Sequence, residues 1–303
     1  MTSDEVKTEF VVSDYGKTNV KLLFVRKGQS KHLIKELEVS SALTLNNHRD
    51  YVFGDNSDIV ATDTQKNTVY ILAKKHGIKN IETFALILSN HFLSKYPHVV
   101  ATKISVQEYP WKRVQMDGQP HNHAFQYIAD CTRVCEVNQK RNEKPVVMSG
   151  IRDLRVLKTT QSAFKNFHQD EYRTLPDTDD RVFSTVVTAS WWYNTASGFC
   201  FDKAWETVKA TIMEKFAGPA DKGVFSASVQ HTLYISSQAA LSRIPQMDHI
   251  EITLPNKHYF DVDFTRFPQV EFAGSENNHV YLGVDKPSGN IHAKVKRAAS
   301  AKL

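Results

Sequence analysis

The sequence predicts an α+β protein made of two successive halves, each with an antiparallel sheet that two helices cover on one face. Two observations support this prediction. Apolar residues alternate with period two in some segments, as in half-buried strands, and recur with the period of an amphipathic helix in others. The order of two strands, two helices and two strands also occurs twice along the chain, without literal repetition of sequence. Strands grouped in this way favour antiparallel pairing, because a parallel sheet needs helices that alternate with single strands.

The first half begins with a predicted hairpin that leads into a helix. Residues 20–25 (VKLLFV) and 34–45 (IKELEVSSALTL) show the near-alternation of strands with one buried face. Residues 62–76 then change to helical composition, and Gly77 follows them as a natural helix end. Asp63 stands where the chain enters this helix, and we expect it to be the N-cap.

A second helix and two further strands complete the first half. The helix is expected over 81–97, where Pro97 ends it. Its apolar stripe consists of Ile81, Phe84, Leu88 and Phe92. The strands are expected over 99–114 and within 123–137.

The second half follows the same order. Its expected elements are strands over 147–160 and 181–194, helices over 203–218 and 226–245, and strands over 249–264, 278–284 and 291–297. The first of these helices carries Trp205, Val208, Ile212 and Phe216 on one face. The polar stretch 138–144 (NQKRNEK) is expected to separate the halves, which gives domains over 1–140 and 141–303. Because each sheet alone would leave its edges unpaired, we also expect an oligomer.

The bulk properties indicate a globular protein that is neither secreted nor bound in a membrane. Hydrophobic residues make up 41% and charged residues 23% of the 303 positions, which is ordinary globular usage. No run approaches the ~18 apolar residues of a membrane span, and the first residues lack the basic and apolar regions of a secretory signal. Cys131, Cys135 and Cys200 are too few for a disulfide framework and match no zinc or redox spacing. The net charge of +5 is scattered, which argues against nucleic acid and suits an anionic small molecule.

Three polar residues of the first half are candidates for chemistry. Lys17 follows a glycine directly before a strand, and Thr62 and Asp63 stand at a helix start. Taken alone, they are explained as a solvated lysine after a turn and as helix-capping residues. The functional interpretation is that Lys17 acts as a base with the Thr62 hydroxyl as its relay partner. Helix-start N–H groups would then bind an anion or a polarised oxygen.

The second half offers residues suited to a flat heterocycle. A planar ring needs an aromatic side chain to stack on and a planar group that donates hydrogen bonds to its carbonyl and ring nitrogen. Phe164 supplies the aromatic ring and the Arg181 guanidinium supplies the planar donor. Gln230, near a helix start, presents an amide donor and acceptor side by side. Taken alone, each residue has a simpler explanation: Phe164 as a core residue, Arg181 as a solvated residue and Gln230 as a residue on a helix surface.

The segment LPNKHYF, residues 254–260, sets Asn256 and His258 on a predicted strand. His258 alone is explained as an ordinary strand histidine. His121 and His123 alternate on another strand, which could suggest a metal, but no further ligand lies at a recognised spacing. We therefore expect no metal.

Taken together and in order, these motifs resemble the urate oxidase (uricase) family over nearly the whole chain. The segments that carry the resemblance are YGK at 15–17, TDTQKNTVY at 62–70, DLRVLKTTQSAF at 153–164, DR at 180–181, SVQ at 228–230, LPNKHYF at 254–260 and AKL at 301–303. The chain departs from the family pattern at Thr18, Ala61 and Ala301, and none of these carries a catalytic group.

The resemblance implies an activity and a role for each candidate. The activity is cofactor-independent oxidation of urate by O2 and water to 5-hydroxyisourate and hydrogen peroxide. Lys17, Thr62 and His258 would form the catalytic proton relay. The substrate-binding residues would be Thr62, Asp63, Phe164, Arg181, Val229, Gln230 and Asn256, with backbone N–H groups contributed by Asp63 and Val229.

The resemblance also implies an assembly and a location. Each chain would form two tandem tunnelling-fold (T-fold) units, over 1–140 and 141–303, and a homotetramer would close the sheets into a barrel with active sites at subunit interfaces. The final Ala-Lys-Leu is close to the S-K-L peroxisomal address and implies an import receptor as partner and a peroxisomal location. Neither nucleic acid nor membrane is an expected partner.

Two alternatives stay open at this point. One is another T-fold enzyme acting on a pterin or purine, such as a cyclohydrolase, which would need a metal-ligand set that the sequence does not offer. The other is a catalytically inactive purine-binding T-fold oligomer.

Overall fold

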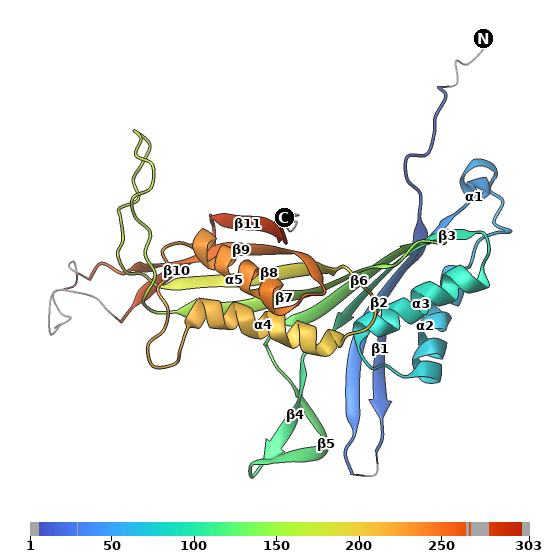
Figure 1. The fold of residues 1–303 in the computed structure, drawn as a ribbon, viewed down its shortest axis with the longest axis horizontal. Coiled ribbons are helices and arrows are strands. Elements are labelled where there is room, and N and C mark those ends of the chain that lie inside the picture. Colours follow the sequence, from blue (N-terminus) through green and yellow to red (C-terminus); the bar gives the residue numbers. More distant parts are fainter. Residues whose placement is uncertain (1–5, 29, 265–266, 268–278, 299–303) are drawn as a thin grey trace, which may run out of the picture. The chain divides into compact units, whose positions relative to one another are not determined.

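The computed structural model describes residues 6–28, 30–264, 267 and 279–298. Proximity of Cα atoms divides the chain into two compact units. The first consists of Met1–Ile128 with Val134–Met148, and the second of Ala129–Arg133 with Ser149–Leu303. Each unit contains strands of a sheet and a pair of long helices (Figure 1).

The first unit is built on the hairpin that the alternating pattern predicted. Its neighbouring strands are, in order, β1 (Tyr15–Arg26), β2 (Leu33–Leu45), β3 (Val99–Glu108) and β6 (Thr132–Lys140). β2 pairs antiparallel with β1 and with β3, and Val39 lies opposite Val20 on one side and Val106 on the other. All three valines are buried, so the apolar alternation read from the sequence marks the face that the core covers.

Two helices cover this face of the first unit. α2 (Thr62–His76) packs against β1, and α3 (Ile81–Lys95) packs against β3. The four residues of the predicted stripe on α3 are at most 1% exposed, which confirms the helical reading of that segment. α2 ends at Gly77, whose φ of 67° is a conformation that favours glycine, as expected from the sequence.

Two elements of the first unit were not expected. The strand predicted over 99–114 is divided, because β3 ends at Glu108 before Pro110 and a separate hairpin of β4 (Trp111–Met116) and β5 (Gln119–Tyr127) follows. Proline has no N–H to donate to a ladder, so the strand stops there. The short helix α1 (Arg49–Phe53) is also additional, and five residues are too few to show a helical period.

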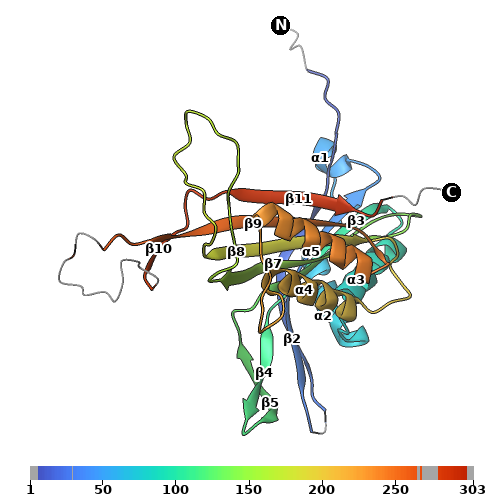
Figure 2. The ribbon, with the colours of Figure 1, turned by 60° about the vertical axis from the view of Figure 1, so that its left-hand side comes forward.

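The second unit has the same order of element types. β7 (Val146–Lys158), β8 (Phe183–Tyr193) and β9 (Met247–Asp261) are neighbours, and both β10 (Tyr281–Val284) and β11 (Asn290–Lys296) pair with β9. The helices α4 (Phe201–Ala217) and α5 (Val229–Arg243) pack against each other, and α5 lies on β9 and β11 (Figure 2). The start of α5 carries Val229 and Gln230, and the end of β9 carries Asn256 and His258.

The core of the second unit confirms most of the predicted face of α4. Val208, Ile212 and Phe216 are buried beneath the sheet, which also buries Trp191 completely. Trp205 is only partly buried, and its indole N–H donates to the carbonyl of Gly150 at 3.0 Å. None of the helices within the described residues combines the length and apolar character needed to cross a membrane.

Candidate active site

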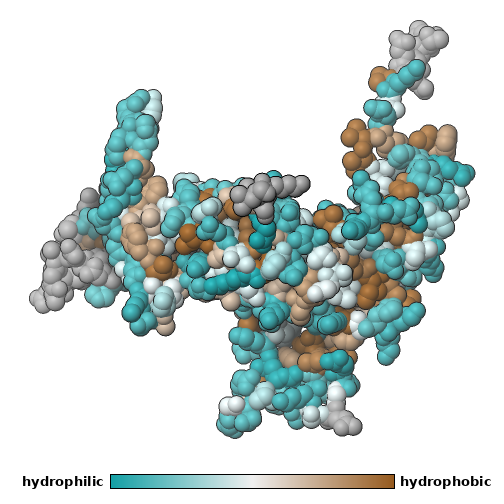
Figure 3. Space-filling view, in the orientation of Figure 1, coloured by the Kyte–Doolittle hydropathy of each residue, from teal (hydrophilic) through white to brown (hydrophobic). Residues whose placement is uncertain are grey.

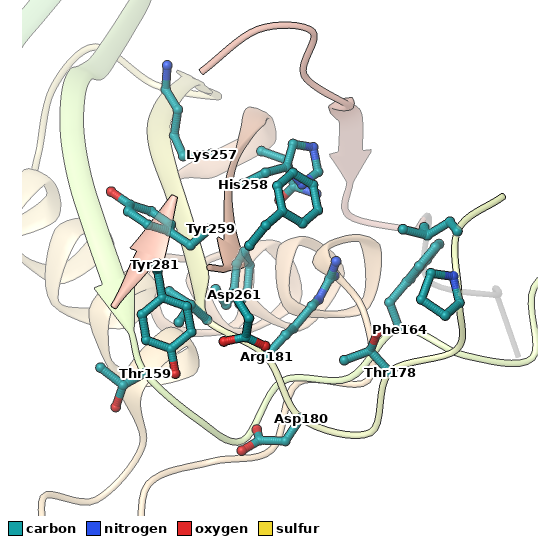
Figure 4. A pocket seen from close by; sticks show the side chains of 16 residues that line it. Thr159, Phe164, Thr178, Asp180, Arg181, Lys257, His258, Tyr259, Asp261 and Tyr281 are labelled. Atoms are coloured by element: carbon teal, nitrogen blue, oxygen red, sulfur yellow. The ribbon is translucent and has the colours of Figure 1, made fainter. Parts of the chain in front are cut away.

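A cavity of about 490 Å³ lies in the second unit, where the end of β9 meets the segment between β7 and β8 (Figure 4). It is lined by both apolar and charged side chains. Four residues singled out from the sequence line it: Phe164, Arg181, Asn256 and His258. A concave site with apolar walls and a few convergent polar groups is the usual form of a small-molecule site.

The end of β9 presents two of these side chains from neighbouring positions. Asn256 lies opposite Thr185 of β8, and its backbone N–H donates to the carbonyl of Gly289 at 2.8 Å. His258 lies opposite Val284 of β10. Side chains two residues apart on a strand point to the same face, so pairing on both sides of β9 directs Asn256 and His258 to the same cavity.

Phe164 and Arg181 come from the irregular segment between β7 and β8. Phe164 is held by two backbone hydrogen bonds with Thr178, at 2.9 and 3.0 Å, and its ring stacks on Phe167 with centroids 4.7 Å apart. The guanidinium carbon of Arg181 is 5.2 Å from the centre of the Phe164 ring. Arg181 was expected to open a strand, but β8 begins two residues later, at Phe183. The arginine thus lies in the loop, beside the ring.

The Arg181 side chain has an unused donor. Its Nε is buried and has no hydrogen-bond partner among the described residues. Burial also lowers the pKa of the guanidinium, which nevertheless stays charged because arginine titrates far above neutrality. A buried donor without a partner is costly unless a ligand satisfies it. The arrangement of ring and cation can therefore receive a flat anion.

The surroundings of His258 favour its neutral form. Burial lowers the pKa of its imidazole, and the positive charge of nearby Arg181 lowers it further. Its ring lies nearly parallel to that of Phe260, with an interplanar angle of 10° and centroids 5.7 Å apart. A neutral imidazole has one nitrogen that donates and one that accepts, so it can pass a proton between two partners.

Lys17 lies in the first unit, on β1 opposite Ser41. The ladder is irregular directly after Lys17, where Asn19 has a φ of 55°. Gly16 explains the close approach of the two strands, because a Cβ at that position would lie 1.7 Å from the carbonyl oxygen of Ser41. Glycine before Lys17 is therefore required by the backbone.

Thr62 and Asp63 are the first two residues of α2, also in the first unit. The expectation that Asp63 is the N-cap is wrong: Ala61 occupies that position and no side chain caps the helix. The Asp63 carboxylate instead accepts from Lys66 Nζ at 2.5 Å and Asn67 Nδ2 at 2.9 Å. These contacts lower the pKa of the Asp63 carboxyl, and the nearby charge of Lys17 contributes in the same direction. The Thr62 hydroxyl and the helix-start N–H groups stay unused by a cap.

Val229 and Gln230 are the first two residues of α5 and do not line the cavity. Ser228 is the N-cap, and its hydroxyl accepts from the N–H of His231 at 3.1 Å. Val229 is buried, whereas the Gln230 side chain is exposed. The cap thus orders the backbone at the helix start, where the N–H of Val229 lies.

Several residues of the cavity wall were not singled out from the sequence. They are Thr159, Leu175, Pro176, Thr178, Asp180, Val182, Phe183, Lys257, Tyr259, Phe260, Asp261 and Tyr281. Asp180 precedes Arg181, and Tyr259 and Phe260 lie in the segment LPNKHYF, so proximity to a motif could have drawn attention to them. No sequence signal marks Tyr281, which reaches the cavity through the pairing of β10 with β9.

The histidine pair on β5 does not form a metal centre with other described residues. No group of three or more His, Cys, Asp or Glu side chains suited to a metal occurs in the part of the chain that the structure describes. His121 Nδ1 accepts instead from the backbone N–H groups of His123 and Ala124, at 3.2 and 3.0 Å.

Comparison with known proteins relates this chain to one family. The family model described as uricase matches residues 13–138 and 147–292. The uricase of Danio rerio is 47% identical over 302 residues, covering 100% of this chain and 99% of its own length. The uricase of Oryctolagus cuniculus is 46% identical over 302 residues, with the same coverage.

Solved structures give the same relationship. The uricase of Arthrobacter globiformis superimposes with a TM-score of 0.88 at 34% identity and covers 98% of both chains. The urate oxidase of Bacillus sp. TB-90, at 21% identity, has the same fold, with a TM-score of 0.78 over 94% of this chain and 100% of that one. The predicted α+β class, with antiparallel sheet and covering helices, is thus the fold of these structures. With a family match over both halves and full-length relatives near half identity, the chain belongs to the uricase family.

Proposed function

We propose that this protein is a urate oxidase that converts urate, O2 and water to 5-hydroxyisourate and hydrogen peroxide without a metal or an organic cofactor. The observation that carries the proposal is the cavity in which Arg181, with its unused buried donor, lies beside the Phe164 ring and shares a wall with Asn256 and His258. Membership of the uricase family supports the choice of substrate.

Substrate binding follows from the chemistry of urate. Urate is a planar anion at neutral pH, so the Arg181 guanidinium offsets its charge while the Phe164 ring stacks on its face. The proposed role of the Gln230 amide and the Val229 N–H, which lie at the start of α5 outside the cavity lining, is to bind the opposite edge of the heterocycle and complete a pincer with Arg181. Held between these groups, urate has one orientation toward the oxygen that it reduces.

The remaining groups move protons. Lys17 and Thr62 take a proton from the urate anion, with the backbone N–H of Asp63 as a further contact, and the more electron-rich ring then gives two electrons to O2. Peroxide leaves, and water adds to the oxidised ring to give 5-hydroxyisourate. Asn256 holds the oxygen or water above the ring, and neutral His258 completes the proton relay.

Lys17, Thr62 and Asp63 reach this cavity from a neighbouring subunit in the proposed assembly. Two T-fold units per chain, over 1–140 and 141–303, would join edge to edge in a homotetramer whose sheets close into a barrel. The outer edge strand β1 supports this idea, because an unpaired edge invites pairing. Leu23 and Val25 of β1 and Ile71 of α2 are also exposed, and Figure 3 shows apolar surface over this part of the first unit.

The proposed location is the peroxisome. The Ala-Lys-Leu sequence at 301–303 lies outside the described residues, and its role as an address for the import receptor rests on the sequence. An oxidase that releases hydrogen peroxide suits a compartment that destroys it.

The proposal is tested by following the ultraviolet absorbance of urate with wild-type protein and with Lys17→Met. The wild type is expected to consume urate, and the variant to lose most turnover while it still binds xanthine, a purine with two of the three ring carbonyls of urate. A wild type that binds xanthine but leaves urate unchanged would point to the inactive purine-binding oligomer. A wild type that neither binds xanthine nor consumes urate would contradict the assignment of the cavity.

A further inference from the structure

Lys158, the last residue of β7, has an ammonium group that the proposed mechanism does not use. Its Nζ donates to the carbonyl of Val224 at 2.7 Å and to the hydroxyl of Ser226 at 2.8 Å. It also lies 5.9 Å from the ring centre of Phe183 and 5.6 Å from that of Phe216. Burial lowers the pKa of this amine. A charged group in apolar surroundings is costly unless it is paired, so these two hydrogen bonds offset its desolvation.

Ser226 joins the segment that carries Phe164 to the segment that begins α5. Its backbone N–H donates to the carbonyl of Gln161 at 2.8 Å, and its carbonyl accepts from the N–H of Ala163 at 3.0 Å. Its hydroxyl accepts from Thr232, in the first turn of α5, at 2.9 Å. Ser226 is 1% exposed, so these partners have no competition from water. The Lys158 ammonium therefore binds where the segment that carries Phe164 meets the segment that begins α5, and this meeting point is called the junction below.

Asp180 ties the Arg181 segment to the same junction. Its carboxylate accepts from the Thr160 hydroxyl at 2.6 Å and from the N–H of Ser162 at 3.4 Å. Its negative charge acts on the Lys158 amine and partly counters the effect of burial on that pKa. Lys158, a partly buried cation, and Asp180, a nearby anion, thus both hold this junction.

We infer that Lys158 is a positioning residue that fixes the Phe164 ring relative to the Val229 N–H and the Gln230 amide. Lys158 does not line the cavity, so it acts through Val224 and Ser226 and touches no substrate. The inference rests on the proposed function, because only there do Phe164 and Gln230 bind one ligand. A Met at this position would fill much of the same space but would leave the Val224 carbonyl and the Ser226 hydroxyl without the donor.

The first test measures amide hydrogen exchange on the full chain. Lys158→Met is expected to speed exchange at 161–164 and 224–232 by tenfold or more, with little change elsewhere in the second unit. The matched control is Lys209→Met, which removes another partly buried lysine of this unit that donates to Asp130 and lies 5.6 Å from the ring centre of Trp205. The control is expected to leave both segments unchanged.

The second test uses steady-state kinetics and binding of xanthine by calorimetry. Lys158→Met is expected to raise KM for urate and Kd for xanthine about tenfold with a smaller loss of kcat, because a misplaced binding group weakens both. A double-mutant cycle combines Lys158→Met with Gln230→Ala. The fold-increase in Kd for xanthine in the double variant is expected to be smaller than the product of the fold-increases in the two single variants, because the two residues act through one contact. Lys209→Met should keep wild-type KM and Kd.

The two tests separate the junction from the proposed function. If wild-type protein fails to oxidise urate, the proposed function is wrong, and hydrogen exchange alone then decides whether Lys158 holds the two segments. Two results would overturn the inference. One is unchanged hydrogen exchange at 161–164 and 224–232 in Lys158→Met. The other is a double variant whose fold-increase in Kd for xanthine equals the product of the two single fold-increases. If Lys158→Met does not fold, Ser226→Ala removes the hydroxyl from the other side of the junction, and the same localised exchange is expected from it.

Discussion

The proton state of His258 is set by where β9 places its ring. The residue lies in the cavity beside the partly buried Arg181 guanidinium, and both burial and that charge favour the neutral imidazole. Because the pKa in the folded protein lies below the unfolded value, this group contributes stability above the unfolded pKa of about 6.5. The contribution is lost as the pH falls from that value through the lower folded pKa.

We predict that the His258 ring titrates with a midpoint below 6.5 in the folded protein. Nuclear magnetic resonance of the ring protons across pH 4 to 8, assigned with His258→Gln, measures this midpoint. Arg181→Ala should raise the midpoint, since it removes a nearby positive charge. A midpoint at or above 6.5 in the wild type would show that the surroundings of this histidine are wrongly described.

Position 16 of β1, directly before Lys17, has no room for a side chain. A Cβ there would lie 1.7 Å from the carbonyl oxygen of Ser41, which is fixed backbone. We expect Gly16→Ala to lower the free energy of unfolding by about 1–3 kcal/mol or more, because β1 must move away from β2. Thermal unfolding measures the change. The control is Gly289→Ala, whose Cβ would meet Ile291 at an ordinary 3.8 Å, and equal effects of the two changes would refute the strand geometry.

Among the elements, the helices were the most predictable from sequence. The stripe on α3 and the glycine after α2 reflect local rules of period and termination, and the structure confirms both. The β4–β5 hairpin was missed because the apolar pattern of β3 runs on past Pro110, where the ladder cannot. The N-cap of α2 was also misread, because Asp63 has nearby partners in Lys66 and Asn67 that compete for its carboxylate.

The candidate site was predictable only in part. Asn256 and His258 share a face through the period of two along β9, so their convergence follows from local sequence. Phe164 and Arg181 lie in a segment with no period, and their approach depends on backbone pairing with Thr178 that no local pattern announces. They were singled out by residue type, as a ring and a planar cation suited to a flat heterocycle, and the family resemblance then placed them in one site. Tyr281, which comes from a strand after a long separation in sequence, had no signal of either kind.

The N-caps of α5 and α3 offer a matched test of what a helix start does. Ser228 accepts from His231 N–H at 3.1 Å and Asn80 accepts from Thr83 N–H at 2.8 Å. Ser228→Ala and Asn80→Ala should each cost about 1 kcal/mol of stability. Only Ser228→Ala is expected to raise KM for urate, because α5 begins with Val229 and Gln230. Thermal unfolding and kinetics check the pair, and a KM raised by both variants would mean that the effect is one of general stability.

For the whole molecule, the central question is whether one site draws residues from two chains. Lys17 and Thr62 lie in the first unit, whereas the cavity belongs to the second. The proposed tetramer brings the first unit of one subunit to the second unit of its neighbour. A site of this kind can be reconstituted from two variants that are each defective in a different half.

We predict that Lys17→Met protein and Arg181→Ala protein regain about a quarter of wild-type activity at low urate when they are unfolded together and refolded as a mixture. In a random mixture, about a quarter of the interfaces pair an intact first unit of one subunit with an intact second unit of its neighbour. Each variant refolded alone is the control and should stay nearly inactive. A mixture no more active than its two components would mean that each site forms within one chain.

The most direct measurement is the ratio of peroxide released to urate consumed by protein treated with chelator and freed of flavin. The proposed reaction predicts one hydrogen peroxide for each urate and each O2, with undiminished turnover after treatment. Turnover that disappears with the metal or flavin and returns when it is added back, or urate consumed without peroxide, would contradict the account.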